Sequence, residues 1–162
     1  MSLETMKYSK GQLNVLIILR LLIGWHFFYE GLIKLFNPAW TAKGYLAGST
    51  GPLQGVFQFL GSESMIGMVD ILNIAALIIV GLGLILGFWT RLAAIAGIVL
   101  LAFYYLSYPP FPWVEQTGPA EGAYLFINKN LIEMMALFVL LKFPTAQYFG
   151  LESLLNKKLE TA

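Results

Sequence analysis

The residues with the clearest chemical potential are ionisable side chains inside an otherwise apolar stretch. Residues 11–36 contain Arg20, His26, Glu30 and Lys34. At about 100° per residue these fall near 0°, 240°, 280° and 320°, within a sector of roughly 120°. A charge at mid-membrane costs ~2.5–3.5 kcal/mol on insertion scales, so it persists where it faces a bundle interior and has partners. The stripe therefore predicts an inward-facing polar surface.

Two other apolar stretches bring ionisable groups to a similar depth as Glu30 and Lys34. These groups stand a few residues inside the outer ends of residues 65–88 and 128–143. The polar residues expected at this level are Asp70, Lys129, Asn130 and Glu133. We expect them to form a polar pocket in the outer half of a helix bundle, roofed by the long loops.

Such a pocket has the side-chain types needed to bind and reduce a quinone, the ligand that the family resemblance described below implies. Lys34 or His26 would donate a hydrogen bond to a quinone carbonyl and stabilise developing negative charge. Glu30 or Glu133 would relay the protons that reduction requires. The aromatic side chains expected to stack on the ring are Trp25, Tyr29 and Trp40.

A purely structural reading of the same charges stays open. Intramembrane ion pairs can lock helices together without chemistry, and His26 fits either a neutral, hydrogen-bonded imidazole or a proton carrier. Arg20 sits deep on the inner side of its segment and is expected to snorkel or hold a backbone carbonyl. Arg91 is expected to be a topology anchor at the membrane edge.

The composition shows what must position these residues. Of the 162 residues, 58% are hydrophobic and 12% are charged, and the mean hydropathy is +0.72. Soluble domains have about 45–50% apolar and about 25% charged residues. Because membrane spans need about 20 apolar residues, we predict one all-α, integral membrane four-helix bundle over residues 1–162. Its spans are expected at about 11–36, 65–88, 92–108 and 128–143.

Several classes of chemistry are excluded by residue counts. The net charge of +1 gives no basic footprint for nucleic acid. The chain has no cysteine, which removes disulfides, thiolate metal sites and thiol redox relays. A single histidine excludes a multi-histidine metal cage within one chain. No metal, haem or flavin motif is present, and the one cofactor expected is the quinone that the family resemblance described below implies.

The flanking segments predict an orientation and two shorter helices. The long-loop side of the predicted bundle has only two basic residues, Lys43 and Lys129. The side with both termini has more: Lys7, Lys10, Arg91, Lys142, Lys157 and Lys158. The positive-inside rule then places both termini in the cytoplasm of a bacterial-type inner (plasma) membrane. We expect a short interfacial helix near residues 53–60 and an amphipathic interfacial helix in the tail, 148–160.

Several short motifs resemble those of a known family. The run from Arg20 through Gly24 and Gly31 to Lys34 resembles the opening of DoxX-like membrane proteins, and Leu86-Gly87-Phe88-Trp89-Thr90-Arg91 is similar to the Leu-Gly-x-x-Thr-Arg turn of that family. Pro38-Ala39-Trp40 with Gly44-Tyr45-Leu46 resembles the DoxD-type branch, the small subunit of a thiosulfate:quinone oxidoreductase. The resemblance implies a four-helix membrane bundle, quinone-linked redox and a second subunit.

Alternative functions remain open at this stage. The chain would be a non-catalytic membrane subunit if its periplasmic loops dock a partner protein and the charges only fix the bundle. A small-molecule carrier is disfavoured because inverted repeats and paired broken spans are lacking, although dimerisation would supply a second half. Partners left open are the lipid bilayer, a second subunit or periplasmic protein, and further copies of this chain.

Overall fold

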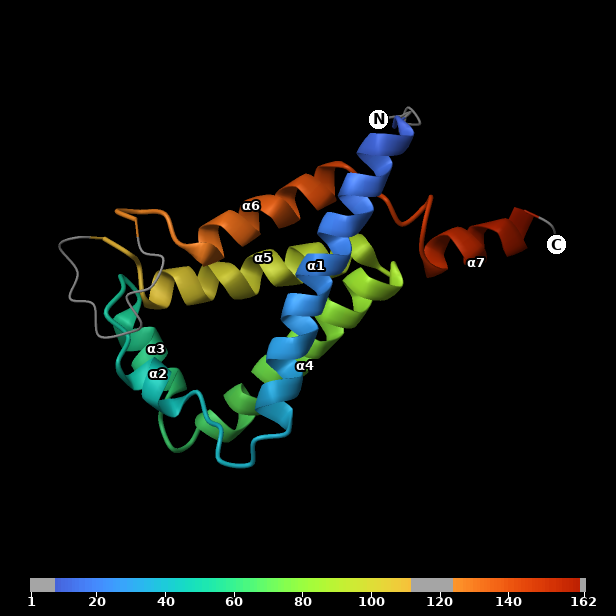
Figure 1. Cartoon of the computed structure of the whole chain (residues 1–162). Helices are drawn as coiled ribbons and strands as arrows, with labels where there is room; N and C mark the ends of the chain where they lie inside the picture. The colour runs from blue at the N-terminus through green and yellow to red at the C-terminus, as the bar shows by residue number, and fades with distance from the viewer. Residues whose placement is uncertain (1–7, 112–123, 161–162) are drawn as a thin grey trace.

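The computed structural model describes residues 8–111 and 124–160, with side chains up to residue 155 (Figure 1). Lys7, counted above for the orientation, lies outside the described residues. The described chain is all-helical apart from its loops and one isolated bridge between Tyr124 and Ile127. Its helices are α1 (Lys10–Leu35), α2 (Lys43–Ala47), α3 (Gln54–Leu60), α4 (Ile66–Leu86), α5 (Thr90–Ser107), α6 (Lys129–Lys142) and α7 (Leu151–Glu160).

Three of the described helices are long and apolar enough to cross a membrane. They are α1, α4 and α5, with 26, 21 and 18 residues. The predicted helix at 128–143 is present as α6, but it has 14 residues. At 1.5 Å per residue it is about 21 Å long, shorter than a hydrocarbon core of ~30 Å. A fourth complete span is therefore not shown.

Local sequence signals explain where these helices begin and end. The Ser9 side-chain oxygen accepts a hydrogen bond from the backbone amide of Gln12, and the Gln12 side-chain oxygen accepts one from the backbone amide of Ser9. The two bonds form a capping box at the start of α1. Asn128 caps α6 by accepting from the Leu131 amide at 3.0 Å. Gly87 ends α4 with φ of 65°, a left-handed conformation that glycine adopts without steric cost.

Helices α1 and α4 form a closely packed pair that cross each other (Figure 1). Glycines permit this approach: a Cβ on Gly24 would lie 3.0 Å from Leu84 Cβ, and one on Gly31 would lie 2.7 Å from Ile78 Cγ1. A Cβ on Gly81 of α4 would collide with the backbone of Phe28. Small residues at such points let helix backbones approach in a bilayer.

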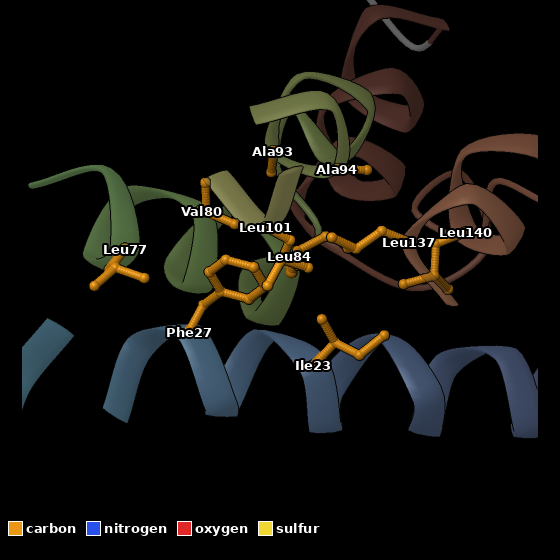
Figure 2. Packing of buried hydrophobic residues seen from close by; sticks show 10 residues of the cluster. All are labelled: Ile23, Phe27, Leu77, Val80, Leu84, Ala93, Ala94, Leu101, Leu137 and Leu140. Atoms are coloured by element: carbon orange, nitrogen blue, oxygen red, sulfur yellow. The ribbon is translucent and has the colours of Figure 1, made fainter. Parts of the chain in front are cut away.

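The second pair, α5 and α6, packs beside the first (Figure 1). Gly97 of α5 leaves room for Leu137 of α6, which is fully buried. Figure 2 shows the apolar cluster where the two pairs meet, with Phe27 rising from α1 toward Leu84 and Leu101. This cluster holds the bundle together; many outward apolar side chains are exposed, as expected for lipid contact, including Ile79 at 68%.

The segment that carries α2 and α3 covers one end of the bundle (Figure 1). The helix expected near 53–60 is confirmed as α3, whereas α2 was not predicted. Ser49 Oγ donates to the carbonyl of Ser107 at 2.9 Å, and the amides of Thr50 and Gly51 donate to the same carbonyl. These bonds fix the segment to the end of α5.

We predict that Gly81→Ala destabilises the bundle, while Gly67→Ala on the same helix does not. The added methyl at position 81 meets the Phe28 backbone, whereas nothing lies within 4 Å of a Cβ at position 67. Overpacking of this kind costs about 1–3 kcal/mol. Thermal unfolding in detergent should show a clear fall in Tm for G81A only. Equal Tm values for the two variants would contradict the packing described here.

Candidate functional site

A cavity of about 760 Å³ lies between the two helix pairs beneath the α2–α3 segment. Side chains from α1, α4, α5 and α6 line it, together with those of α2 and α3. Its apolar floor is made by Phe27, Leu77 and Leu101, which also belong to the core cluster (Figure 2). The cavity therefore occupies the half of the bundle where the pairs separate.

One wall of the cavity carries the charged stripe of α1. His26, Glu30 and Lys34 all line it, one helical turn apart. Lys34 Nζ forms an ion pair with the Glu30 carboxylate and donates to the Glu30 carbonyl at 3.2 Å. The same Nζ lies 5.6 Å from the ring centroid of Trp40, which also lines the cavity. The lysine head is thus held at the wall by a carboxylate and an aromatic face.

Helix α6 completes this wall with an acid. Glu133 Oε1 lies 2.7 Å from His26 Nδ1, which joins α6 to α1. An ionised carboxylate only accepts hydrogen bonds, so this bond requires a proton on Nδ1 whenever Glu133 is ionised. The Glu133 side chain is 13% exposed and that of His26 is 45% exposed. Asn128, Lys129 and Asn130 line the cavity beside this pair.

Tyrosines from α2 and the end of α5 form a second polar wall. Tyr104 donates its hydroxyl to Asn73 Oδ1 on α4, and Tyr45 donates to the Tyr104 carbonyl at 3.2 Å. Tyr108 donates to the Tyr45 carbonyl at 2.7 Å. Although the Tyr45 side chain is partly exposed, burial around its hydroxyl raises its pKa to about 12, so it stays a neutral donor at physiological pH.

Sequence reasoning missed this second wall. Tyrosines at the end of a span resemble the aromatic belt at a membrane interface, and Asn73 is an isolated amide in an apolar helix. A polar amide inside a span was the available signal, because it needs a hydrogen-bonding partner there.

Three of the expected site residues lie outside the cavity. Trp25 and Tyr29 are 56% and 51% exposed and stack on each other at 6.0 Å between ring centroids. Their helical positions lie more than about 90° from the direction of Glu30 and Lys34, so they face away. Asp70 Oδ1 instead accepts from the amide of Ala42 at 2.8 Å, and so fixes the loop before α2.

Arg20 lies at the other end of the bundle and holds the C-terminal segment. It is 1% exposed, and it donates to Thr145 Oγ1 at 3.0 Å and to the Phe149 carbonyl at 2.7 Å. The expected bond to a backbone carbonyl is therefore present. Beside it, the Glu152 amide donates to the Gly87 carbonyl at 3.2 Å, next to the exposed Arg91. These contacts attach the start of α7 to the α4–α5 turn.

The cavity has no set of metal ligands. Among the described residues, no group of three or more His, Asp or Glu side chains is arranged to hold a metal ion. Its polar groups are the Glu30–Lys34 ion pair, the hydrogen-bonded His26 and Glu133, the Lys129 amine, hydroxyls and amides. They suit hydrogen bonding to a small organic molecule and proton exchange with it.

The fold and site define a helical membrane protein with a polar internal cavity. A family model described as DoxX matches residues 15–108, more than half of the chain, and the protein belongs to the DoxX family. The matched region contains α2–α5 and nearly all of α1, whereas Glu133 and the rest of α6 lie beyond it. No curated protein and no solved structure matches the chain.

We predict that Arg20→Met loosens the C-terminal segment. The change leaves Thr145 and the Phe149 carbonyl without their buried donor, and hydrogen bonds to charged groups contribute about 1.5–3 kcal/mol each. Limited proteolysis should cut residues 144–160 faster in R20M than in wild type. Lys10→Met, which removes an exposed cation from the same helix, should leave the cleavage rate unchanged. Equal rates for all three proteins would disprove the anchoring role.

Proposed function

We propose that this DoxX-family protein is the membrane subunit of a quinone-linked oxidoreductase and binds the quinone head in the cavity. One observation carries the proposal: the pairs His26–Glu133 and Glu30–Lys34 line the same cavity, together with aromatic and apolar side chains. Small-molecule sites usually have volumes of about 300–1,000 Å³, mainly apolar linings and a few convergent polar groups. The cavity of about 760 Å³ meets this description.

The chemistry of quinone reduction gives each charged residue a role. Two electrons and two protons convert a quinone to a quinol. Lys34, held by Glu30, would donate a hydrogen bond to one carbonyl oxygen and stabilise its developing charge. The His26–Glu133 pair would deliver protons to the other oxygen, since both groups exchange protons readily. The electrons would come from a reduced substrate oxidised by the complex.

The finer assignment follows the sequence resemblance at Pro38–Trp40 and Gly44–Leu46. A DoxD-type subunit would make thiosulfate the electron donor and would work beside a second subunit. Trp40 and Tyr45 from these motifs line the cavity, which supports a role for this stretch at the quinone site.

We also propose that the cavity lies in the periplasmic half of a bacterial-type inner membrane. The greater number of basic residues flanks the opposite end, with Lys10, Arg91 and Lys142 among them. The positive-inside rule places that end in the cytoplasm with both termini.

Quinone binding tests the main proposal. Decylubiquinone should quench the intrinsic fluorescence of the purified chain saturably, since Trp40 lies in the cavity wall. Glu30→Gln and Lys34→Met should each raise Kd at least tenfold, because a hydrogen bond to a charged group contributes about 1.5–3 kcal/mol. The control variants Lys43→Met and Glu63→Gln break an exposed ion pair outside the cavity and should titrate like wild type. Identical titrations for all five proteins would rule out this site.

Orientation can be measured with single cysteines, because the chain has none of its own. Ser64→Cys, in the exposed loop before α4, should react with a membrane-impermeant maleimide added to spheroplasts. Gln147→Cys, exposed near the start of α7, should react only after the membrane is opened. The reverse pattern would show that the cavity faces the cytoplasm.

A further inference from the structure

Helices α4 and α5 touch closely at one end and separate toward the other. Beside their turn, a Cβ on Gly83 would lie 3.0 Å from Ala93 Cβ, so the two backbones are near contact there. From this turn the helices diverge toward the end covered by α2 and α3 (Figure 1). The cavity lies at the diverging end, where it is lined by residues of both helices.

Apolar side chains border this divergence and also line the cavity. On α4 they are Met68 and Leu72, whose side chains are 51% and 59% exposed. At about 100° per residue, both point within roughly 60° of the direction of Gly83, which faces α5. On α5 they are Leu100 and the 45%-exposed Phe103, both within roughly 80° of Ala93. The same side chains thus face the cavity and the apolar exterior of the bundle.

The opposite side of the cavity is closed differently. There His26 of α1 and Glu133 of α6 are joined by their 2.7 Å contact. At the diverging end of the α4–α5 gap, the ring of Phe57 from α3 meets Phe103 edge-on at 6.2 Å. On the cavity side, the bond from Tyr104 to Asn73 crosses from α5 to α4. The gap is therefore apolar, with polar groups appearing only on its inner side.

We propose that the α4–α5 gap is a lateral portal to the lipid, which admits a quinone and retains its alkyl or isoprenoid tail. This inference rests on the proposed quinone site. A tail that leaves between Met68, Leu72 and Phe103 stays among apolar groups along its whole length, while the head reaches the ionic wall on α1. Each methylene of the tail that stays in contact with apolar groups avoids the free-energy cost of exposure to water.

The test compares two tritiated probes on the purified full chain. One is 2,3-dimethoxy-5-methyl-1,4-benzoquinone, which has no tail, and the other is its decyl derivative. Leu72→Trp fills the gap, and Ile71→Trp is the control, since Ile71 is 69% exposed on the same helix but does not line the cavity. L72W should weaken binding of the decyl probe at least tenfold and change that of the tail-less probe less than twofold. I71W should bind both probes like wild type.

The results separate the portal from the quinone site itself. If wild type and L72W bind the decyl probe equally, or if L72W loses both probes to the same extent, the portal is disproved while the quinone site stands. A phospholipid that remains in the gap when the decyl probe binds also disproves it. If wild type binds neither probe, the quinone site fails first.

Discussion

The cost of placing a charge in hydrocarbon governs the arrangement of this protein. Arg20, His26, Glu30 and Lys34 share one helix, and each is turned to a partner rather than to lipid. Arg20 binds the C-terminal segment at one end of the bundle. At the far end Lys34 pairs with Glu30, and His26 pairs with Glu133. One stripe on α1 thereby serves two purposes, since it fastens the chain at the first end and forms a polar wall at the second.

Small residues decide where space remains between the helices. Glycines on α1 and α4 allow these two helices to cross in close contact, and Gly97 does the same for α5 against α6. Between the pairs, α4 and α5 approach closely around Gly83 and Ala93, and Phe27 and Val80 pack against Gly97. The pairs therefore separate toward the other end, and the volume between them becomes the cavity. Packing at one end and separation at the other follow from where glycine and alanine occur.

The cavity has charged and polar side chains on one side and apolar side chains on the other. The Glu30–Lys34 ion pair stands on α1, His26 and Glu133 join α1 to α6, and apolar side chains border the gap between α4 and α5. An amphipathic ligand that lives in the bilayer matches this gradient, with its polar head on one side and its tail on the other. Most of the residues that line the cavity lie in the region matched by the DoxX family model. Helix α6 adds Glu133, the partner of His26, from outside that region.

The sequence by itself determined the helices at 11–36, 65–88, 92–108 and 128–143 to within a few residues, because apolar runs and Gly, Pro and Asn signals are local. It also determined that His26, Glu30 and Lys34 share a face, since helical periodicity fixes their directions. Only the tertiary structure decided which acid meets which partner. Glu133 binds His26, whereas Asp70, at a similar expected depth, caps a loop amide. It also brought Tyr104 to Asn73 and left Trp25 outside. These outcomes depend on how each helix is rotated and where it crosses its neighbours, which arises from contacts between residues far apart in the chain.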